Sequence, residues 1–246
     1  MKNYNRVLID LGNTACKVAL AKEMEIGPVF KSDGSAPLSF LREVLDNRRE
    51  TFDIIVLSSV QKFDPQLVAY LEERSYRLIV VDGDTPTALR INYQTSDRIG
   101  ADLLAAGTGA ISLFPGEDLL VIDFGTAITF ESINKEGWLT GVNISPGMQT
   151  RYRALHHFTH ALPYIVMEEE ETVPDYGVDT RGAMTAGVVQ GIVHEIEGYI
   201  AKNKDKKIIL TGGDAIYFAK QLKTPIFVDC NLIFTGLALI AQRYAA

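Results

Sequence analysis

The chain has 246 residues, of which 47% are hydrophobic and 22% are charged, and its net charge is −7. This composition is sufficient for a packed core, in one large domain or in two half-size lobes, and it disfavours a disordered chain. The acidic balance disfavours a nucleic-acid-binding protein, because that function requires a basic surface. A small charged ligand is still compatible with this charge, since backbone amides, a bound cation or a few arginines can hold it.

The first half of the chain predicts the order β-β-β-α-β-α-β, followed by another helix. Asp64 and Pro65 form a clear helix start. The last helix contains Gly100, Gly107 and Gly109, so we expect a neighbouring element to pack closely against it. The expected strands are 7–10, 17–21, 27–31, 54–57 and 78–81, and the expected helices are 39–49, 64–74 and 99–113.

The second half repeats part of this pattern. The sequence DLGNTA at residues 10–15 and the sequence DFGTA at residues 123–127 each follow an apolar strand and precede another strand. A duplicated strand-turn-strand unit suggests two related lobes. The expected strands here are 119–123, 129–133, 138–144, 208–210 and 226–228, and the expected helices are 152–160, 180–201, 215–222 and 232–243.

No segment has the pattern of a membrane span or a secretory signal. The apolar run at residues 7–9 is too short for a signal, and Thr235 and Gly236 interrupt the apolar stretch near the C-terminus. The two cysteines, Cys16 and Cys230, lack the spacing of a metal site, which fits a reducing compartment. We therefore expect a cytoplasmic protein with no membrane partner.

The two repeated turns have the composition of phosphate-binding loops. Each contains an aspartate at the end of a buried strand, a glycine where the backbone turns, and a threonine hydroxyl; exposed amides in such a turn bind anions. The aspartates would repel a polyphosphate directly, so we expect them to hold bridging cations. One Asp-x-Gly alone is usually a plain β-turn, but two copies favour a pair of turns that bind one nucleotide. The residues are Asp10, Gly12 and Thr14 in the first copy and Asp123, Gly125 and Thr126 in the second.

A third segment, TGGD at residues 211–214, follows a strand and opens a helix, where backbone can approach an adenosine closely. On its own it would be an ordinary loop. The sequence contains no Gly-x-x-x-x-Gly-Lys-Ser/Thr motif. The protein-kinase signature Asp-Phe-Gly at residues 123–125 is a chance match, because the loops that should accompany it are absent from the sequence.

Asp102 is the candidate catalytic base. It lies in the first turn of the helix expected after Gly100 and Ala101, and phosphoryl transfer needs one group to orient the attacking hydroxyl and accept its proton. An acid at a helix N-terminus is equally expected for helix stability alone, so both interpretations remain open.

Several other polar residues have a plain structural interpretation. Thr180 fits an N-cap of the following helix. His156 and His160 have the spacing of a metal pair on a helix, but no third ligand is evident nearby, so a surface or packing role is favoured. The acidic run at residues 168–171 is typical of a solvated loop.

At these residues the chain resembles type III pantothenate kinases, the first enzymes of coenzyme A biosynthesis, from Asp10 to the last helix. No single motif is decisive, but the ordered set is highly specific. The matching segments are 10–17, Tyr93 with Gly100-x-Asp102, 123–129, 141–147, 161–163, Gly177 with Thr180, and 211–213.

The resemblance implies an α/β fold of two ribonuclease-H-like lobes, the actin-like ATPase and sugar-kinase fold, built from duplicated βββαβαβα units. Residues 1–117 would form the N-terminal lobe with the first phosphate loop, and residues 118–246 the C-terminal lobe with the second loop and the adenosine site. The implied reaction is ATP-dependent phosphorylation of pantothenate to 4′-phosphopantothenate. The implied assembly is a homodimer whose interface completes the acceptor pocket.

The resemblance also implies the role of individual residues. Asp102 would be the catalytic base, Asp10 would hold Mg²⁺ directly or through water, and Asp123 would hold K⁺ or NH₄⁺. Tyr93, Gly100, Ala101 and Thr180 would contact pantothenate, Thr180 from across the dimer. ATP would be bound by Asp10, Gly12, Asn13, Thr14, Lys17, Gly125, Thr126, Gly212 and Gly213.

The chain departs from the family pattern at two places. Leu103 replaces the arginine that usually follows the catalytic aspartate, and an apolar side chain cannot hold an anionic acceptor. Arg98 is a hypothetical substitute for that arginine. The double glycine before the Pro-Gly loop is reduced to Thr140 and Gly141.

Two alternatives remain. One is a related kinase for a sugar or another small hydroxy acid. The other is a non-catalytic relative that serves as an accessory factor in transcription, which Leu103 favours but Asp10, Asp102, Asp123 and the acidic surface disfavour.

Overall fold

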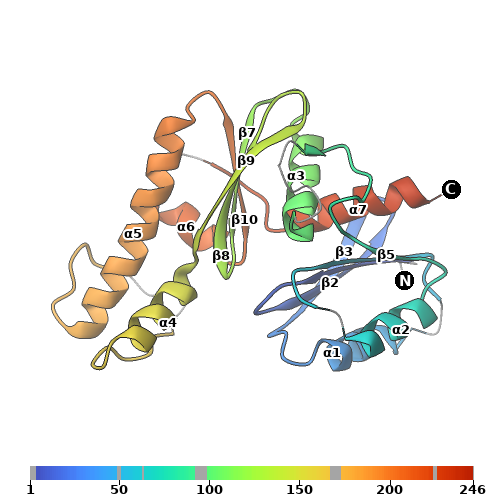
Figure 1. The fold of residues 1–246 in the computed structure, drawn as a ribbon, viewed down its shortest axis with the longest axis horizontal. Helices are drawn as coiled ribbons and strands as arrows, with labels where there is room; N and C mark the ends of the chain where they lie inside the picture. The colour runs from blue at the N-terminus through green and yellow to red at the C-terminus, as the bar shows by residue number, and fades with distance from the viewer. Residues whose placement is uncertain are drawn as a thin grey trace. The chain divides into compact units, whose positions relative to one another are not determined.

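The chain forms two compact units, shown in a computed structural model that describes residues 4–48, 51–62, 64–91, 99–166, 173–223 and 226–245 (Figure 1). The first unit comprises Met1–Glu117, Ile133–Gly141 and Asn231–Ala246, and the second comprises Asp118–Ser132 and Val142–Cys230. Both chain ends therefore belong to the first unit. The assignment of lobes to 1–117 and 118–246 stays a prediction.

The first unit is built on a five-stranded sheet, whose strands are β1 (Arg6–Leu11), β2 (Cys16–Lys22), β3 (Glu25–Ser32), β4 (Ile54–Ser59) and β5 (Leu78–Val80). Their order in the sheet is β3-β2-β1-β4-β5. β1, β2 and β3 form an antiparallel meander, whereas β4 pairs parallel with β1 and β5 pairs parallel with β4. All residues of β1 are buried, which explains its unbroken apolar run before Asp10.

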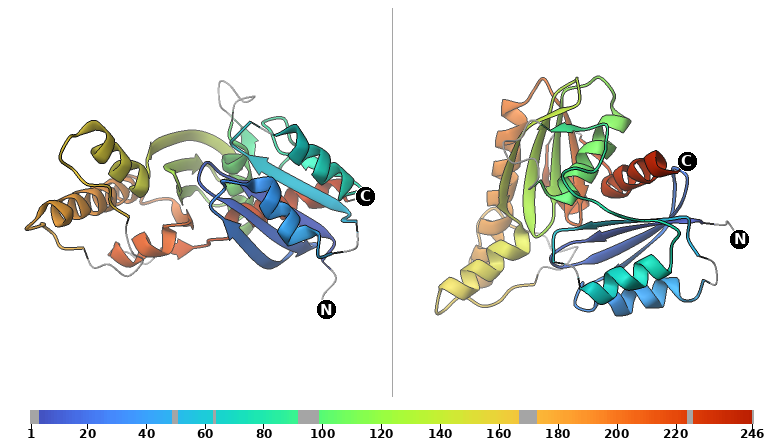
Figure 2. Two further views of the ribbon diagram at one scale, coloured as in Figure 1. Left: turned by 90° about the horizontal axis from the view of Figure 1, so that it is seen from below. Right: turned by 45° about the vertical axis from the view of Figure 1, so that its right-hand side comes forward.

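Two helices, α1 (Pro37–Leu45) and α2 (Pro65–Glu73), cover one face of this sheet (Figure 1, Figure 2). Their apolar residues pack against the β1 side chains Val7 and Ile9 in one buried cluster. The predicted start of α2 is confirmed, since the Asp64 carboxylate caps the helix by accepting a hydrogen bond from the Gln66 N–H at 2.9 Å.

The other face of the first sheet is covered by α3 (Ala101–Leu113) and α7 (Leu232–Tyr244). The two helices pack with their backbones close together. A Cβ atom on Gly109 would overlap the Leu232 carbonyl oxygen, and one on Gly236 would overlap the Ala105 carbonyl oxygen. The close packing expected from the glycines of α3 is therefore confirmed.

A second sheet contains β7 (Leu119–Phe124), β8 (Ala127–Ile133), β9 (Trp138–Pro146), β10 (Lys207–Gly212) and β11 (Phe227–Val228). The strand order is β11-β10-β7-β8-β9, and β10 pairs parallel with both β7 and β11. The short strand β6 (Arg90–Ile91), which the sequence did not predict, extends this sheet by pairing parallel with Trp138 and Leu139 at the start of β9.

Three helices pack in the second unit: α4 (Met148–Phe158), α5 (Thr180–Lys202) and α6 (Ala215–Gln221). One buried cluster joins the β7 side chains Leu120 and Ile122 to an apolar stripe of α5 that includes Val189 and Ile192. The cluster also contains Phe124, the residue that follows Asp123, so the core anchors the start of the predicted second phosphate loop.

Two helices, α1 and α4, differ most from their predicted bounds. α1 ends at Leu45, because its C-cap is Asp46 and the Asn47 side chain bonds back to the Glu43 carbonyl oxygen at 3.2 Å. α4 starts at Met148, directly after the N-cap Gly147, instead of at residue 152. It also ends at Phe158, so His160 lies outside the helix and does not form a helical pair with His156.

Within the ranges that the structure describes, every helix is too short or too polar to span a bilayer. The acidic run at residues 168–171 lies outside the described residues.

Candidate active site

The predicted first phosphate loop joins β1 to β2. Asp10 lies opposite Lys17 in the register of the two strands, and the Lys17 Nζ atom is 3.9 Å from Asp10 Oδ2. The Gly12 N–H donates to the Ala15 carbonyl oxygen at 2.9 Å and closes the turn. Asn13 and Thr14 at its tip are exposed. The exposed tip of the loop therefore lies next to the pair formed by Asp10 and Lys17.

Asp10 is buried, with only 8% of the residue exposed. Burial raises the pKa of Asp10 to about 6, the Lys17 ammonium lowers it, and the negative charge of Asp102 raises it further. The structure thus brings the predicted cation ligand, the predicted lysine and the predicted catalytic base together in one unit. A buried carboxylate with a neighbouring carboxylate is a site that a bound cation would stabilise.

Asp102 lies in the first turn of α3, where the Leu103 N–H donates to its Oδ1 atom at 2.9 Å. Burial raises the pKa of the Asp102 carboxyl, and this hydrogen bond opposes the shift. The N-cap is Gly100, and a Cβ atom there would overlap Asp102 Oδ1. Gly100 therefore leaves the space that the Asp102 side chain occupies, while Ala101 is buried beside it.

The sequence patterns did not point to Gln61, which contacts the first phosphate loop. Its Nε2 atom donates to the Gly12 carbonyl oxygen at 2.7 Å, and the preceding Val60 N–H donates to the Leu11 carbonyl oxygen at 3.2 Å. Only the topology could have indicated Gln61. β4 runs parallel to β1, so the residues that follow β4 lie at the same edge of the sheet as the first phosphate loop. Tyr93 and Arg98 lie outside the described residues.

The second phosphate loop joins β7 to β8 and adjoins the TGGD segment. In the parallel pairing of β7 with β10, Asp123 is opposite Thr211 and Phe124 is opposite Gly212. Gly212 has a φ of 95°, and a Cβ atom there would overlap Asp123 Oδ1 and the Phe124 carbonyl oxygen. The predicted cation ligand and the predicted adenosine segment are thus neighbours in the second unit. Gly213 is exposed beside them.

The turn of the second loop is also closed by a glycine N–H, but it is tighter than the first, because the Gly125 N–H donates to the Ala127 carbonyl oxygen, two residues on, at 3.0 Å. Residues at the start of α4 donate hydrogen bonds to this turn. The Thr126 carbonyl oxygen accepts hydrogen bonds from the Gly147 N–H at 3.0 Å and from Thr150 Oγ1 at 2.6 Å. Thr150 had no signal in the sequence, since the predicted helix began after it.

Thr180 is remote in sequence from both loops and is the first residue of α5. The N-cap is Asp179, whose carboxylate accepts from the Gly182 N–H at 2.7 Å, so the N-cap interpretation of Thr180 is wrong. Thr180 instead lines a groove of about 730 Å³ in the second unit. The other lining residues are Pro146, Arg151, Ala154, Leu155, Leu162, Ala183, Met184, Gly187 and Val188.

Among the residues that the structure describes, no three His, Cys, Asp or Glu side chains are grouped closely enough to hold a metal ion. Asp10 and Asp123 nevertheless fit cations that are shared with a nucleotide, because Mg²⁺ commonly takes only one or two carboxylates and completes its shell with phosphate oxygens and water.

The family described as type III pantothenate kinase matches residues 6–202. A type III pantothenate kinase from Porphyromonas gingivalis is 39% identical over 241 residues, which cover 96% of this chain and 97% of that protein. The chain belongs to the type III pantothenate kinase family. A second relative with this name, from Bacteroides fragilis, is 39% identical over 235 residues and covers 94% of this chain and 95% of that protein.

Solved structures with the same fold are more distant than these pantothenate kinases. The activator of 2-hydroxyisocaproyl-CoA dehydratase from Clostridium difficile, with bound ADPNP, has a TM-score of 0.58 at 15% identity, and the match covers 98% of each chain. A Campylobacter jejuni protein described as a member of the Baf family of transcriptional activators has a TM-score of 0.63 at 20% identity, covering 97% of this chain and 98% of that one. At these identities the likeness concerns the fold alone, and it confirms the predicted actin-like ATPase and sugar-kinase fold.

Proposed function

We propose that this chain transfers the γ-phosphoryl group of ATP to the terminal hydroxyl of pantothenate, the first step of coenzyme A biosynthesis. The observation that carries the proposal is the grouping of Asp10, Lys17 and Asp102 in the first unit, in a chain of the type III pantothenate kinase family. A phosphate loop with a buried acid, next to a second acid with a raised pKa, is the pair of groups that phosphoryl transfer to an alcohol requires.

In this mechanism Asp102 orients the pantothenate hydroxyl and accepts its proton. Its raised pKa favours that role, because a base is most effective when its pKa approaches the working pH. Lys17 and the loop residues Gly12, Asn13 and Thr14 bind the phosphates. Asp10 would hold Mg²⁺, directly or through water, and the ion would neutralise charge on the phosphates.

The second unit would bind ATP through Gly125 and Thr126 at the phosphates and through Gly212 and Gly213 at the adenosine. Asp123 would hold a monovalent cation, K⁺ or NH₄⁺. The geometry that supports these roles is the parallel pairing of β7 and β10, which places Asp123 beside the glycine segment.

Pantothenate would contact Tyr93, Gly100, Ala101 and, from the partner chain, Thr180. Leu103 cannot hold the pantothenate carboxylate, and we assign that part to Arg98. Arg98→Ala should raise the KM for pantothenate and leave the KM for ATP nearly unchanged. An unchanged pantothenate KM would remove Arg98 from the acceptor site.

The assembly we propose is a homodimer. The groove that Thr180 lines is largely apolar. Large apolar side chains are also exposed on the segments that flank α4 and α5, and such surfaces are typical of protein interfaces. They include Phe158 at the end of α4 and Tyr176 and Val178 before α5. Light scattering of the purified protein tests this assembly, and a monomer at micromolar concentration would refute it.

A cytoplasmic location, without a membrane or nucleic-acid partner, completes the proposal. The net charge of −7 supports the absence of a nucleic-acid partner, because such a partner would require a basic surface.

The deciding experiment is ATP-dependent phosphorylation of pantothenate in buffers whose only monovalent cation is K⁺, NH₄⁺ or Na⁺. Turnover with K⁺ or NH₄⁺ but not Na⁺ would support both the reaction and the cation at Asp123. If ATP binds and no buffer supports turnover, a panel of other hydroxy acids and sugars separates a different kinase from the non-catalytic accessory factor.

A further inference from the structure

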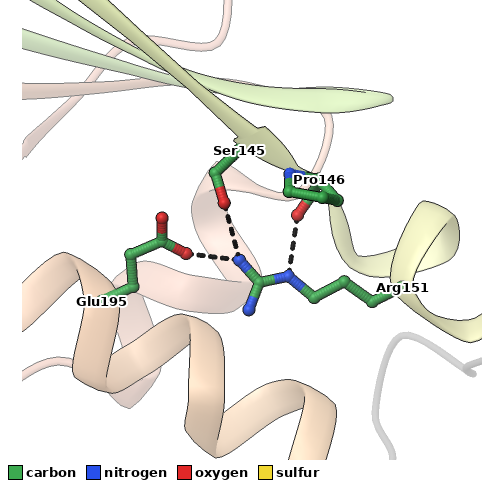
Figure 3. A network of polar contacts seen from close by, with 4 residues as sticks. All are labelled: Ser145, Pro146, Arg151 and Glu195. Carbon is green, nitrogen blue, oxygen red and sulfur yellow. Dashed lines mark hydrogen bonds and ion pairs between the residues drawn. The ribbon is translucent and has the colours of Figure 1, made fainter.

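Arg151 forms the centre of a polar network in the second unit (Figure 3). It lies in the first turns of α4, and its Nε atom donates to the Pro146 carbonyl oxygen at 2.8 Å. One terminal nitrogen donates to Ser145 Oγ at 3.0 Å and also to the Glu195 carboxylate of α5. One guanidinium therefore joins α4, α5 and the end of β9.

The residues that Arg151 holds are directly connected to the second phosphate loop. Pro146 is followed by Gly147, whose N–H donates to the Thr126 carbonyl oxygen, and the Arg151 N–H donates to the Gly147 carbonyl oxygen at 2.9 Å. A Cβ atom on Gly147 would overlap the Gly125 carbonyl oxygen. The turn at Gly147 thus lies against the backbone of the loop without room for a side chain.

We propose that Arg151 is a positioning residue for the second phosphate loop. It holds Ser145 and Pro146 in place, and these residues position Gly147, which contacts the backbone of Gly125 and Thr126. Arginine suits the task because its planar group offers several donors in fixed directions, which a lysine cannot reproduce. Glu195 holds the guanidinium in the required orientation.

The consequence is that ATP affinity depends on a residue that itself lies in the wall of the groove with Thr180. The inference rests on the proposed function only in assigning ATP to the loop of Gly125 and Thr126. A different role for Arg151, direct contact with pantothenate in that groove, makes an opposite prediction about which substrate is affected.

The test compares Arg151→Met with Arg153→Met. Methionine keeps an unbranched apolar stem in the groove, and Arg153 is an exposed arginine on the same helix. Binding of a non-hydrolysable ATP analogue with Mg²⁺ is measured by calorimetry, together with the KM of each substrate, well below the melting temperature of every variant. We expect Arg151→Met to weaken analogue binding and raise the ATP KM by about tenfold, with a pantothenate KM within about twofold of wild type.

Two conservative variants distinguish positioning from general stability. Arg151→Lys keeps the charge facing Glu195 but not the bond to Pro146, so its ATP KM should fall between those of wild type and Arg151→Met. Glu195→Gln should shift the ATP KM in the same direction by a smaller factor. These variants also test the proposal if Arg151→Met does not fold.

The proposal is overturned if analogue binding by the Arg151 variants equals that of Arg153→Met. It is also overturned if the pantothenate KM rises while the ATP KM does not, because Arg151 would then belong to the acceptor site. A wild-type protein that binds the analogue but does not phosphorylate pantothenate refutes the proposed acceptor, and the binding comparison still decides the role of Arg151.

Discussion

Asp10 and Asp102, which come from different segments of the chain, lie close enough in the first unit for the charge of Asp102 to raise the pKa of Asp10. β1 delivers Asp10 to the loop end of the sheet, and α3 begins there with Asp102 in its first turn. Two neighbouring carboxylates with one lysine make a site that is short of positive charge. This arrangement is suited to a bound cation, which would offset the unfavourable burial of two negative charges.

The first prediction concerns Asp102 as the base. Asp102→Asn keeps the size of the side chain but cannot accept the hydroxyl proton, so kcat should fall by roughly 10² to 10⁴, the usual contribution of a positioned base. ATP binding should change little, because Asp102 is not part of either phosphate loop. Steady-state kinetics and direct ATP binding check both statements. A kcat within about threefold of wild type would remove Asp102 from this role.

The second prediction concerns the stability of the nucleotide-free and magnesium-free protein. The pKa of Asp10 rises from 3.8 to about 6 on folding. Between these values the folded chain keeps a proton that the unfolded chain releases, so rising pH lowers the stability. Asp10→Asn removes this effect. The variant should therefore be more stable than wild type above about pH 6, by on the order of 2 to 3 kcal/mol, and the difference should vanish below about pH 4.

Urea unfolding between pH 4 and pH 8 measures this difference. Asp84→Asn, at an exposed acid in the same unit, is the matched control and should stay within about 0.5 kcal/mol of wild type throughout. Parallel stability curves for wild type and Asp10→Asn would show that burial does not raise the pKa of Asp10. The same variant should bind Mg²⁺-ATP more weakly than wild type, although its fold is more stable.

The third prediction concerns Gln61, whose side chain holds the Gly12 carbonyl oxygen at 2.7 Å. Gln61→Leu removes this hydrogen bond and should loosen the first phosphate loop. The ATP KM should rise by about three- to tenfold, as expected for the loss of one net hydrogen bond. Gln66→Leu, at an exposed glutamine in α2, is the control. Equal ATP KM values in the two variants would mean that Gln61 does not position the loop.

The sequence predicted the local units of this protein well, because they depend on neighbouring residues. Each repeated motif forms the expected strand-turn-strand unit, although the turns differ in length: residues 12–15 join β1 to β2, and residues 125–126 join β7 to β8. The glycines of α3 also predicted a close neighbour, since a helix with several glycines needs packing to compensate for its low propensity. The family assignment rested on the order of such units and is confirmed.

The supporting residues could not be predicted, because they act through pairing that only the fold creates. Gln61 meets Gly12 through the parallel pairing of β4 with β1, and Thr150 meets Thr126 because α4 starts earlier than its apolar pattern indicates. Because polar residues predominate at the start of α4, its first turn lacks the apolar periodicity that predicts a helix. In the same way, Asp179 rather than Thr180 is the N-cap of α5, since both residue types suit that position.

The last prediction concerns the contact between the second phosphate loop and the glycine segment after β10. Gly212 has a φ of 95°, and a Cβ atom there would overlap both Asp123 Oδ1 and the Phe124 carbonyl oxygen. Gly212→Ala should therefore destabilise the protein by about 1 to 3 kcal/mol from backbone strain alone, and it should weaken ATP binding by displacing Asp123. Gly213→Ala is the matched control, because the nearest atom to its Cβ would be 4.0 Å away. Gly213→Ala controls the stability measurement only, because Gly213 is itself proposed to contact the adenosine. Chemical unfolding of the two variants decides the matter: similar losses of stability at both positions would mean that the overlap at Asp123 is not what constrains this segment.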